Sequence, residues 1–443
     1  MLRLASWPAA TGMLLVLLAV PVRAQDILTV EQATRQAIAN NAGIRASRAG
    51  VAERDARIDE ARASWFPRVS VTEAWQRGNQ PVFVFSSLLA SRRFGSGNFA
   101  VDALNHPDAV GVHRTSIVLQ QLIFDRRQGA EVDRTILARD AATLTLAEAR
   151  ATLALATVEV YGRVVASDAS RRAALAAHQA AQADRARAAD RRDAGMATDA
   201  DVLALEAHIA ALAQRVARAE GENAMARAHL NRLMGAPIDR VYQLVAPTPG
   251  APAEAVELAA LLAEADARRP AMGHATLLER LARTDRRLAR ASLLPRVTAQ
   301  GGLEVNGTRF DTRASSWLVG AEVSWSLSLG GAERASVAAA AHAEARAVAE
   351  ADEARALVHA EVVAALAAQR SATARLAAGG AAVDRARESE RIVRDRFEAG
   401  LAGVTDLLRA QGAVLDADAE RTAAAIDAMV SAAELARAVG RTP

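Results

Sequence analysis

Two segments of the chain alternate apolar and polar residues with a period of two. From Trp317 to Leu329 every second residue is Trp, Val, Ala or Leu, and Ser, Gly or Glu stands at nearly every position between them. Val297 to Val305 alternates in the same way. Such alternation over roughly ten residues, with tryptophans in the apolar set, is typical of membrane β-strands. A water-facing hairpin packed on a core gives the same pattern, but that alternative must explain where a second core would come from.

The first half of the chain has two similar but less regular segments, Val69–Trp75 and Thr115–Phe124. We therefore expect four strands. Residues 77–114 and 306–313 are rich in Gly, Asn and Pro, and they are predicted to form loops at the tips of the strands.

A different period follows Gly195, where apolar residues recur at spacings of three and four without a break. The series is Val202, Leu205, Ile209, Leu212, Val216, Ala219, Asn223, Ala226, Leu230 and Leu233. This is a heptad seam, so we expect helices that supercoil against their neighbours. The corresponding series from Leu407 to Ala438 is interrupted by Arg421 and Ser431.

The distribution of proline predicts two very long helices. No proline occurs between Pro107 and Pro237, or between Pro295 and the terminal Pro443. Because proline breaks helices, the helices are expected at roughly 126–192 and 332–398. At ~1.5 Å per residue each would be about 100 Å long.

The sequence is internally duplicated. The segment around Pro67 returns around Pro295, 228 positions later, and the segment around Gly195 returns around Gly400, 205 positions later. A repeat of this length is too long for a solenoid unit. We expect one body built from two repeats.

The predicted organisation follows from this duplication. Residues 25–443 form the body, with a first repeat at 25–245 and a second at 254–443. The strands lie within 67–124 and 295–329, and the proline-rich segment 246–253 links the two halves. Residues 1–24 have the pattern of a secretory signal peptide. Arg3 precedes an apolar stretch, and Val-Arg-Ala forms a small-residue cleavage pattern before Gln25.

Composition narrows the class of protein. The chain has no cysteine, and every basic residue among its 54 is arginine. The formal net charge of +3 falls to +1 without the two arginines of the signal segment. Acidic and basic residues are interleaved, which indicates a solvated helical surface and not a nucleic-acid-binding patch.

The sequence contains no recognisable catalytic site. The eight histidines are scattered without metal-ligand spacing, and the Gly-Gly pairs lack the lysine and spacing of a phosphate loop. We expect no enzymatic activity, no metal and no cofactor.

Four membrane strands cannot close a barrel, because the smallest single-chain barrels have about eight. An open sheet edge is not tolerated in lipid. Several copies must therefore pool their strands, and the long helices would then surround the same axis as a tube. We expect the chain to reverse direction at Gly195 in the first half and at Gly400 in the second, at the mouth of that tube.

From about Leu28 to Gly440 the chain resembles the TolC-type outer-membrane efflux protein family. The resemblance rests on the order and duplicated spacing of several short segments. These are Glu31-Gln32-Ala33 with Ala39-Asn40-Asn41, the Pro-Arg-Val triplets at Pro67 and Pro295, Leu122-Ile123-Phe124-Asp125, the two glycine turns, and Leu230 to Gly235.

The resemblance implies a mixed, mostly α fold. Duplicated long-helix hairpins would form a trimeric periplasmic α-barrel, and four β-strands per chain would contribute to a 12-stranded outer-membrane β-barrel. The implied function is the exit duct of a tripartite efflux pump or type I secretion system. Its partners would be a periplasmic adaptor (membrane fusion) protein and an inner-membrane transporter, and its location the cell outer membrane, extending into the periplasm.

The resemblance also implies site residues. The tips that dock the adaptor correspond to Gly195-Met196-Ala197 and to Gly400-Leu401-Ala402. The acidic ring at the periplasmic gate corresponds to Asp406, with Asp201 at the matching place in the first half.

The chain departs from the family pattern near this gate. A second family acid is replaced by Arg409, and a tyrosine and an arginine of the closing network are replaced by Phe397 and Gly403. A simpler interpretation of Asp201 and Asp406 is that they stabilise the N-termini of the returning helices.

Two other classes of protein share parts of these patterns. A periplasmic adaptor would have a single coiled-coil hairpin between β-rich halves, whereas this chain duplicates its hairpin. A structural coiled-coil protein would lack the period-two segments with their tryptophans.

Overall fold

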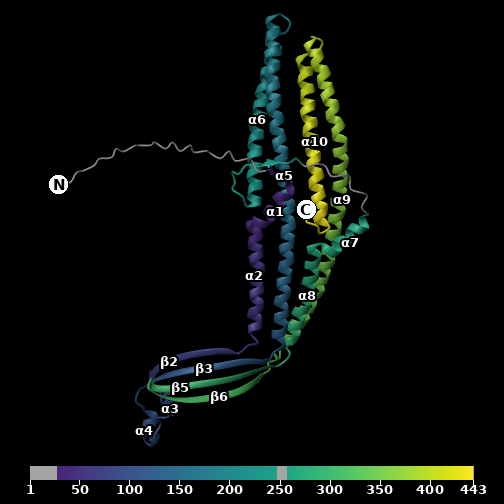
Figure 1. Cartoon of the computed structure of the whole chain (residues 1–443). Helices are drawn as coiled ribbons and strands as arrows, with labels where there is room; N and C mark the ends of the chain where they lie inside the picture. The colour runs from purple at the N-terminus through teal and green to yellow at the C-terminus, as the bar shows by residue number, and fades with distance from the viewer. Residues whose placement is uncertain (1–26, 247–256, 443) are drawn as a thin grey trace, which may run out of the picture.

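The computed structural model describes residues 27–246 and 257–442. The predicted signal peptide, residues 1–24, lies outside the described residues, and so does the predicted linker apart from Ala246. The described chain forms a long body of helices with a four-stranded sheet at one end (Figure 1).

Each half of the described chain contains the same series of helices. The first half has α1 (Val30–Asn40), α2 (Ala42–Ala63), α5 (Arg126–Asp193) and α6 (Asp199–Met234). The second half has α7 (Leu258–Arg268), α8 (Pro270–Ala291), α9 (Ala332–Glu398) and α10 (Val404–Ala438). The prediction of duplicated long-helix hairpins is confirmed, with 68 residues in α5 and 67 in α9. No helix within residues 27–246 and 257–442 is long and apolar enough to cross a membrane.

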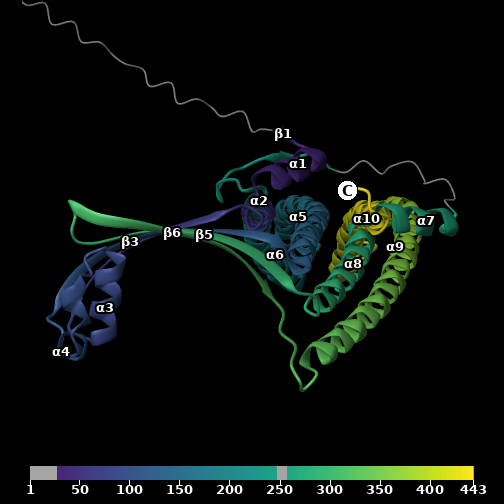
Figure 2. The same cartoon turned by 90° about the horizontal axis from the view of Figure 1, so that it is seen from below.

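The helices pack side by side along most of the molecule. Helix α5 packs against α2 and α8 on the half nearer the sheet, and against α6 and α10 on the half that ends in the tips (Figures 1 and 2). Helix α9 packs against α8 and α10. A Cβ atom on Gly162 of α5 would lie 2.5 Å from the Ile426 side chain of α10, so the two helices approach closely because this position has no side chain.

The heptad seam of α6 faces its neighbours. Seven of its ten predicted positions are buried, namely Val202, Leu205, Leu212, Ala219, Asn223, Leu230 and Leu233. The buried Asn223 is satisfied, because its side-chain amide donates to the hydroxyl of Ser167 (3.0 Å) and to the carboxylate of Asp168 (2.9 Å). The seam therefore combines apolar packing with one polar link to α5.

Tyr161 fastens the two ends of the first repeat to α5. Strands β1 (Ile27–Leu28) and β4 (Gln243–Leu244) pair in parallel beside it. The buried phenol oxygen lies 2.8 Å from the carbonyl oxygens of Leu28 and Val245, and it accepts a hydrogen bond from the Val245 N–H at 3.0 Å. Removing this hydroxyl would leave a buried N–H without its partner.

A buried arginine fastens the second repeat in a similar place. Arg269, between α7 and α8, donates to the carbonyl of Arg437 near the end of α10. Its guanidinium also pairs with Glu148 of α5 at 3.2 Å and with Glu361 of α9 at 3.0 Å. The junction of α7 and α8 is thus held to α5, α9 and α10 at one point.

The sheet consists of β2 (Arg68–Gly78), β3 (Val110–Phe124), β5 (Arg296–Arg309) and β6 (Thr312–Ser324). All neighbouring pairs are antiparallel, in the order β2-β3-β5-β6. The prediction of four strands is confirmed. Strands β2 and β6 form the two edges, and each has only one strand partner.

Several sequence-based boundaries were wrong. Residues 306–309 and 312–313 belong to β5 and β6, so the predicted loop there is a two-residue turn. Strand β6 ends at Ser324, although the alternation continues to Leu329. The predicted first loop holds α3 (Pro81–Ala90), the 3₁₀ turn η1 (Ser96–Phe99) and α4 (Val101–Asn105).

Register gives the sheet two unlike faces. Val71, Ile117, Leu303 and Trp317 lie opposite one another across the four strands, and so do Val69, Leu119, Gly301 and Val319. This set of positions is the apolar face. The alternate positions form the polar face, which carries the rows Arg68, Gln120, Gln300, Gly320 and Thr72, Ser116, Glu304, Ser316.

The environment of Tyr161 predicts a loss of stability in alkali. Burial raises the pKa of Tyr161 to about 12, above the ordinary value near 10 that it has when unfolded. The folded state therefore favours the neutral phenol, and its stabilisation is complete below about pH 10 and lost as pH rises through about 12. Because the chain has no lysine or cysteine, few other groups titrate in this window. Thermal unfolding followed by helical circular dichroism should show a decrease of roughly 2 kcal/mol between pH 9 and 12. Tyr161→Phe should remove that slope, and an unchanged slope in this variant would contradict the assignment.

Candidate functional site at the hairpin tips

The first tip is built around a glycine in the left-handed conformation. Helix α5 ends at Asp193, and Gly195 follows with φ +76°. The Gly195 N–H donates to the Arg192 carbonyl at 2.9 Å, and the Met196 N–H donates to the Arg191 carbonyl at 2.8 Å. This pair of hydrogen bonds ends a helix on glycine because other residues are strained at positive φ.

The second tip repeats the first in detail. Gly400 has φ +77°, and its N–H donates to the Phe397 carbonyl at 3.0 Å. The Leu401 N–H donates to the Arg396 carbonyl at 2.7 Å. Met196 and Leu401 are both exposed at the end of the body. The structure therefore gives both predicted tip triplets the same backbone and presents one apolar side chain from each.

The two acidic candidates lie at equivalent positions but have different surroundings. Asp201 is the third residue of α6 and forms a capping box with Thr198. Its carboxylate accepts from the Thr198 N–H at 3.0 Å and from the Thr198 hydroxyl at 2.8 Å. These hydrogen bonds hold the pKa of Asp201 below its ordinary value. The Asp201 carboxylate is therefore engaged in capping α6.

Asp406 lacks such a partner at the start of α10. Gly403 precedes the helix and offers no side-chain cap. The Asp406 carboxylate lies 3.6 Å from the guanidinium of Arg409, and both side chains are more than half exposed. An exposed pair of this kind is weak and is screened by salt. Asp406 thus carries a charge at the tip that is only partly compensated.

Arg191 joins the two tips, and the sequence analysis did not single it out. Its guanidinium donates to the carbonyl of Phe397 at 2.9 Å and lies 5.6 Å from the centre of the Phe397 ring. A cation at the C-terminus of a helix is favourable, because the last carbonyls lack partners within the helix. The available signal was an arginine in the last turn of α5, but many arginines lie along this helix.

An apolar cluster lies just behind this contact. Ala188 of α5, Val202 and Leu205 of α6, and Val404 of α10 are buried together, and Phe397 packs against them. The structure therefore brings both predicted tips into one unit. Phe397 contributes its ring and its carbonyl oxygen to that unit.

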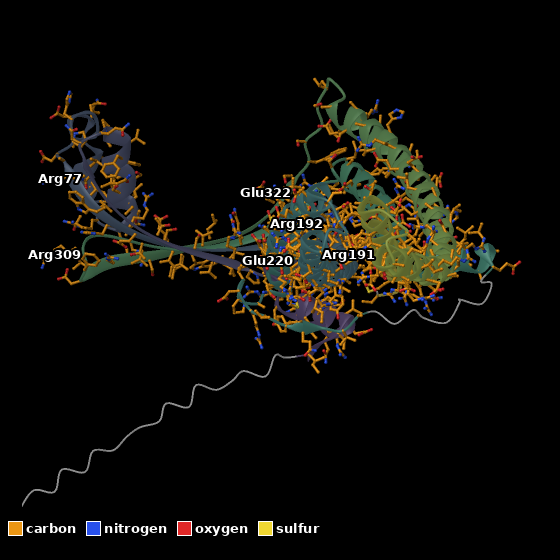
Figure 3. All side chains as sticks on the ribbon, turned by 90° about the horizontal axis from the view of Figure 1, so that it is seen from above. Arg77, Arg191, Arg192, Glu220, Arg309 and Glu322 are labelled. Atoms are coloured by element: carbon orange, nitrogen blue, oxygen red, sulfur yellow. The ribbon has the colours of Figure 1, made fainter. Side chains whose placement is uncertain are left out.

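The charged side chains around the tips are mixed in sign. Figure 3 looks down on the tips and shows nitrogen and oxygen atoms distributed over the helices, with Arg191 and Arg192 labelled near the centre. Arg192 pairs with Asp193 at 2.7 Å and with Asp199 at 3.6 Å, all within the first hairpin. The prediction of a solvated, ion-paired helical surface agrees with these contacts.

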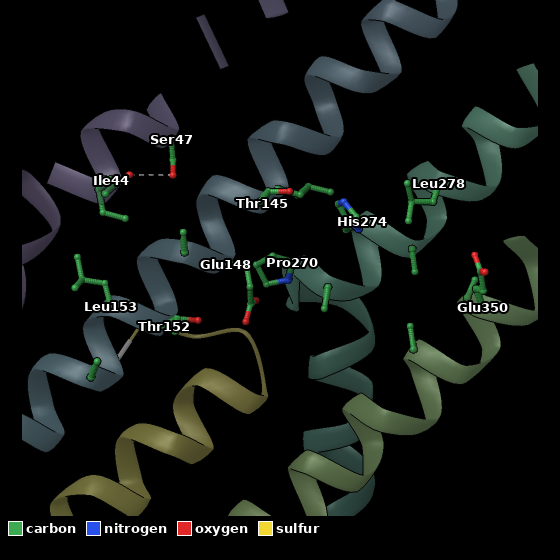
Figure 4. A pocket seen from close by; sticks show the side chains of 18 of the residues that line it. Ile44, Ser47, Thr145, Glu148, Thr152, Leu153, Pro270, His274, Leu278 and Glu350 are labelled. Atoms are coloured by element: carbon green, nitrogen blue, oxygen red, sulfur yellow. Dashed lines mark hydrogen bonds between the residues drawn. The ribbon is translucent and has the colours of Figure 1, made fainter. Parts of the chain in front are cut away.

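A separate hollow lies on the half of the body nearer the sheet. Residues from α2, α5, α8 and α9 line a cavity of about 820 Å³ (Figure 4). Its walls are mostly aliphatic, with Glu148, His274 and Glu350 among the few polar side chains. None of the residues predicted for the tips or the gate lines it, so the tips and this hollow are distinct.

Comparison with known proteins gives one family and one fold. The model of a family described as outer membrane efflux protein matches residues 33–236 and 261–441. A comparison with curated protein sequences finds no match.

Several solved structures have the same fold over 93% of this chain. One is a membrane protein from Pseudomonas aeruginosa, with TM-score 0.78, 18% identity and 90% of its own chain covered. The second is the Campylobacter jejuni CmeC outer membrane channel, with TM-score 0.78, 15% identity and 85% covered. The third is the Vibrio cholerae outer membrane protein VceC, with TM-score 0.75, 17% identity and 96% covered.

The Arg191 contact can be tested by its effect on the distance between the tips. Spin labels would attach only to the introduced cysteines of Met196→Cys and Leu401→Cys, because the chain has no native cysteine. Arg191→Ala should broaden the distance distribution between the labels, because the α9 carbonyls lose their cationic partner. Arg192→Ala is the matched control, because among the described residues its acidic partners, Asp193 and Asp199, both lie in its own hairpin. It should leave the distribution unchanged. Equal distributions in the two variants would show that Arg191 does not hold the tips together.

Proposed function

The chain belongs to the outer membrane efflux protein family, and on that premise we propose that three copies form the exit duct of a tripartite efflux pump or type I secretion system. The protein resides in the cell outer membrane and extends into the periplasm, as this family does. The duct would passively carry small molecules or proteins handed over by an inner-membrane transporter through a periplasmic adaptor. The family consists of channels, and we propose that this chain performs no catalytic step.

The observation that carries the proposal is the sheet with one apolar face and two unpaired edges. The apolar face suits contact with lipid, whereas β2 and β6 each leave one row of backbone groups without a strand partner. In lipid such edges must be paired. Pairing β6 of one copy with β2 of the next, three times over, would close a 12-stranded barrel around the polar face.

In this arrangement the polar face of the sheet lines the interior of the barrel, which we call the lumen. The long helices would continue the wall of the duct into the periplasm. We propose residues 25–443 as one functional unit made of the repeats 25–245 and 254–443.

Assembly gives the direct test of this proposal. We expect native mass spectrometry of the protein, extracted from outer membranes in detergent, to show three copies of the chain. Pro substitution at Ser316 or Val319 of β6 should abolish the trimer, because proline removes a backbone donor from the sheet. A stable, detergent-independent monomer would rule out the exit duct.

The tips Gly195-Met196-Ala197 and Gly400-Leu401-Ala402 are the proposed docking sites for the adaptor. Their shared backbone and the exposed Met196 and Leu401 side chains support this role. Replacing Gly195 and Gly400 together by Val should strain both turns, at ~1–2 kcal/mol each.

We expect the double Val variant to lose adaptor cross-linking and efflux while its trimer still forms. Gly221→Val is the matched control, because Gly221 lies within α6 and a Cβ atom there would meet nothing within 4 Å. Full adaptor cross-linking and efflux in the double variant would refute the docking role of the tips.

Asp406 and, to a lesser degree, Asp201 are the proposed gate. Three copies of Asp406 around an aperture would attract cations from the periplasm, although Arg409 offsets part of that charge. Asp406→Ala should reduce cation selectivity in planar bilayers, and Arg409→Ala should increase it. Asp201→Ala should do less, since its carboxylate is engaged by Thr198. Unchanged selectivity in the Asp406 and Arg409 variants would leave Asp406 as a helix-end carboxylate outside the conduction path.

A further inference from the structure

We infer that a glycine pair in α9, Gly379-Gly380, and Arg421 of α10, which faces it, form a hinge in the second hairpin. Beyond this hinge the tip half of the hairpin, residues 381–420, bends as one piece, whereas the first hairpin stays straight at the matching level. The hinge belongs to the single chain and does not depend on the proposed trimer. Only its effect on the width of the duct rests on that proposal.

The glycine pair lies in the interior of a helix of 67 residues, and no close contact explains it. A Cβ atom on Gly379 would lie 3.6 Å from the Cα atom of Arg421, an ordinary contact, and one on Gly380 would meet nothing within 4 Å. At Gly162 of α5, by contrast, a Cβ atom would lie 2.5 Å from Ile426. Each glycine disfavours a helix about fivefold relative to alanine, and pairs of small residues are where long helices bend. Helix α9 is therefore weak at a place where its neighbours would tolerate alanine.

Helix α10 is also weak at this level. Arg421 interrupts its heptad seam, and in the single chain no residue of α10 between Leu407 and Ala424 is buried. Over the matching stretch of α6, 205 positions earlier, Leu205 and Leu212 are buried. On the tip side of Arg421, helix α10 thus offers little packing that would resist a bend in α9.

The first repeat has different residues at the places that form the hinge. Ala174 and Leu175 stand where the second repeat has the glycine pair, and Ala174 is buried. Val216, a member of the α6 seam, stands at the place of Arg421. The two repeats share the same backbone at their tips, but only the second has two adjacent glycines in its long helix at this level.

A buried polar network further stiffens the first hairpin near this level. Asn223 of α6 donates to Ser167 and Asp168 of α5, and Arg227 of α6 pairs with Asp168 at 2.7 Å. The matching residues of the second hairpin are mostly alanines, namely Ala428, Ala372, Thr373 and Ala432. The first hairpin is thus held across its two helices by buried hydrogen bonds that the second cannot form.

Exposed ion pairs join the two helices of the second hairpin instead (Figure 1). Arg375 pairs with Asp427 at 2.9 Å on the sheet side of the glycine pair, and Arg387 pairs with Asp418 at 3.0 Å on the tip side. Exposed pairs of this kind add little rigidity. They keep α9 beside α10 on both sides of the hinge, so the two helices bend together.

Hydrogen bonds with α5 hold the tip half of the second hairpin at rest. Gln411 of α10 donates to the buried carboxylate of Asp184 at 2.9 Å. Arg191 donates to the Phe397 carbonyl at the tip itself. When these contacts part, a bend of about 10° would move the tip, ~27 Å from the hinge at ~1.5 Å per residue, by roughly 5 Å. In the proposed trimer three such bends would widen the periplasmic aperture while the first hairpins keep their places.

Hydrogen–deuterium exchange of the intact protein in detergent tests the hinge directly. Corrected for intrinsic rates, the amides of residues 376–386 should be roughly tenfold or more less protected than those of residues 171–181, the matching stretch of α5. The double variant Gly379→Ala, Gly380→Ala should raise their protection by about tenfold or more, because alanine favours the helix at both places. Arg421→Val should raise it as well, since it restores the seam residue of the first repeat.

The matched control is the double variant Gly50→Ala, Gly221→Ala. Both glycines lie in helix interiors outside the second hairpin, and a Cβ atom on either would meet nothing within 4 Å. This variant should leave the protection of residues 376–386 unchanged. Equal protection of the two stretches in the unsubstituted chain, or an equal gain in both double variants, would overturn the hinge.

Tip motion provides a second measurement. Spin labels at Met196→Cys and Leu401→Cys, in trimers assembled with excess unlabelled chain and carrying Arg191→Ala, report the distance between the released tips. Alanine at both hinge glycines should narrow this distribution about twofold, and the control pair should not. An unchanged width would overturn the hinge as the source of tip motion. A missing trimer in the unsubstituted chain counts against the exit duct, whereas a trimer whose exchange and width match the control counts against the hinge alone.

Discussion

The unpaired backbone along β2 and β6 constrains the whole molecule. A sheet that presents an apolar face to lipid cannot leave two rows of N–H and C=O groups without partners, because each such group costs several kcal/mol in hydrocarbon. Closure with other copies satisfies both edges at once. The helices must follow that closure, since β3 ends at Phe124 and α5 begins at Arg126 with only Asp125 between them. The Asp125 carboxylate accepts from the Arg127 N–H at 2.8 Å, so the strand leads directly into a capped helix. In the proposed trimer the barrel and the helical tube would therefore share one symmetry.

The sequence predicted those elements whose causes are local. The absence of proline from Pro107 to Pro237 and from Pro295 to Pro443 left room for α5 and α9, and glycine marked both tips, because one residue type decides each feature. The two outer connections were predicted as loops because Gly, Asn and Pro are common in them. Asn306 is nevertheless part of β5, buried and hydrogen-bonded to Glu304 at 2.6 Å, and Arg93 of the first connection donates to Thr308 of the same strand. That arrangement depends on a segment two hundred residues earlier, which no local pattern records.

The candidate site likewise combines features with local causes, which the sequence predicts, and features that depend on distant residues. The tip triplets and the two aspartates could be located from the duplicated spacing and the family resemblance. Their surroundings could not, because Arg191 reaches a carbonyl oxygen of the other repeat and carbonyls carry no sequence signal. The sequence does contain a sign of the difference between the two aspartates, because Thr198 stands three residues before Asp201 with the spacing of a capping box, whereas Gly403 stands three residues before Asp406. The sequence analysis did not use that spacing. Both are differences between repeats that otherwise have the same backbone.

That last difference makes the first turn of α10 less firmly held than the first turn of α6. Helix α6 starts on a side-chain capping box, whereas α10 starts on Gly403, which has no side chain to cap it. Relative to glycine, a side-chain cap contributes only a few tenths of a kcal/mol. Fraying should therefore begin at the first turn of α10, which contains Asp406 and precedes Arg409. In the proposed trimer, three more mobile first turns of α10 would then alternate with three less mobile first turns of α6 around the periplasmic end.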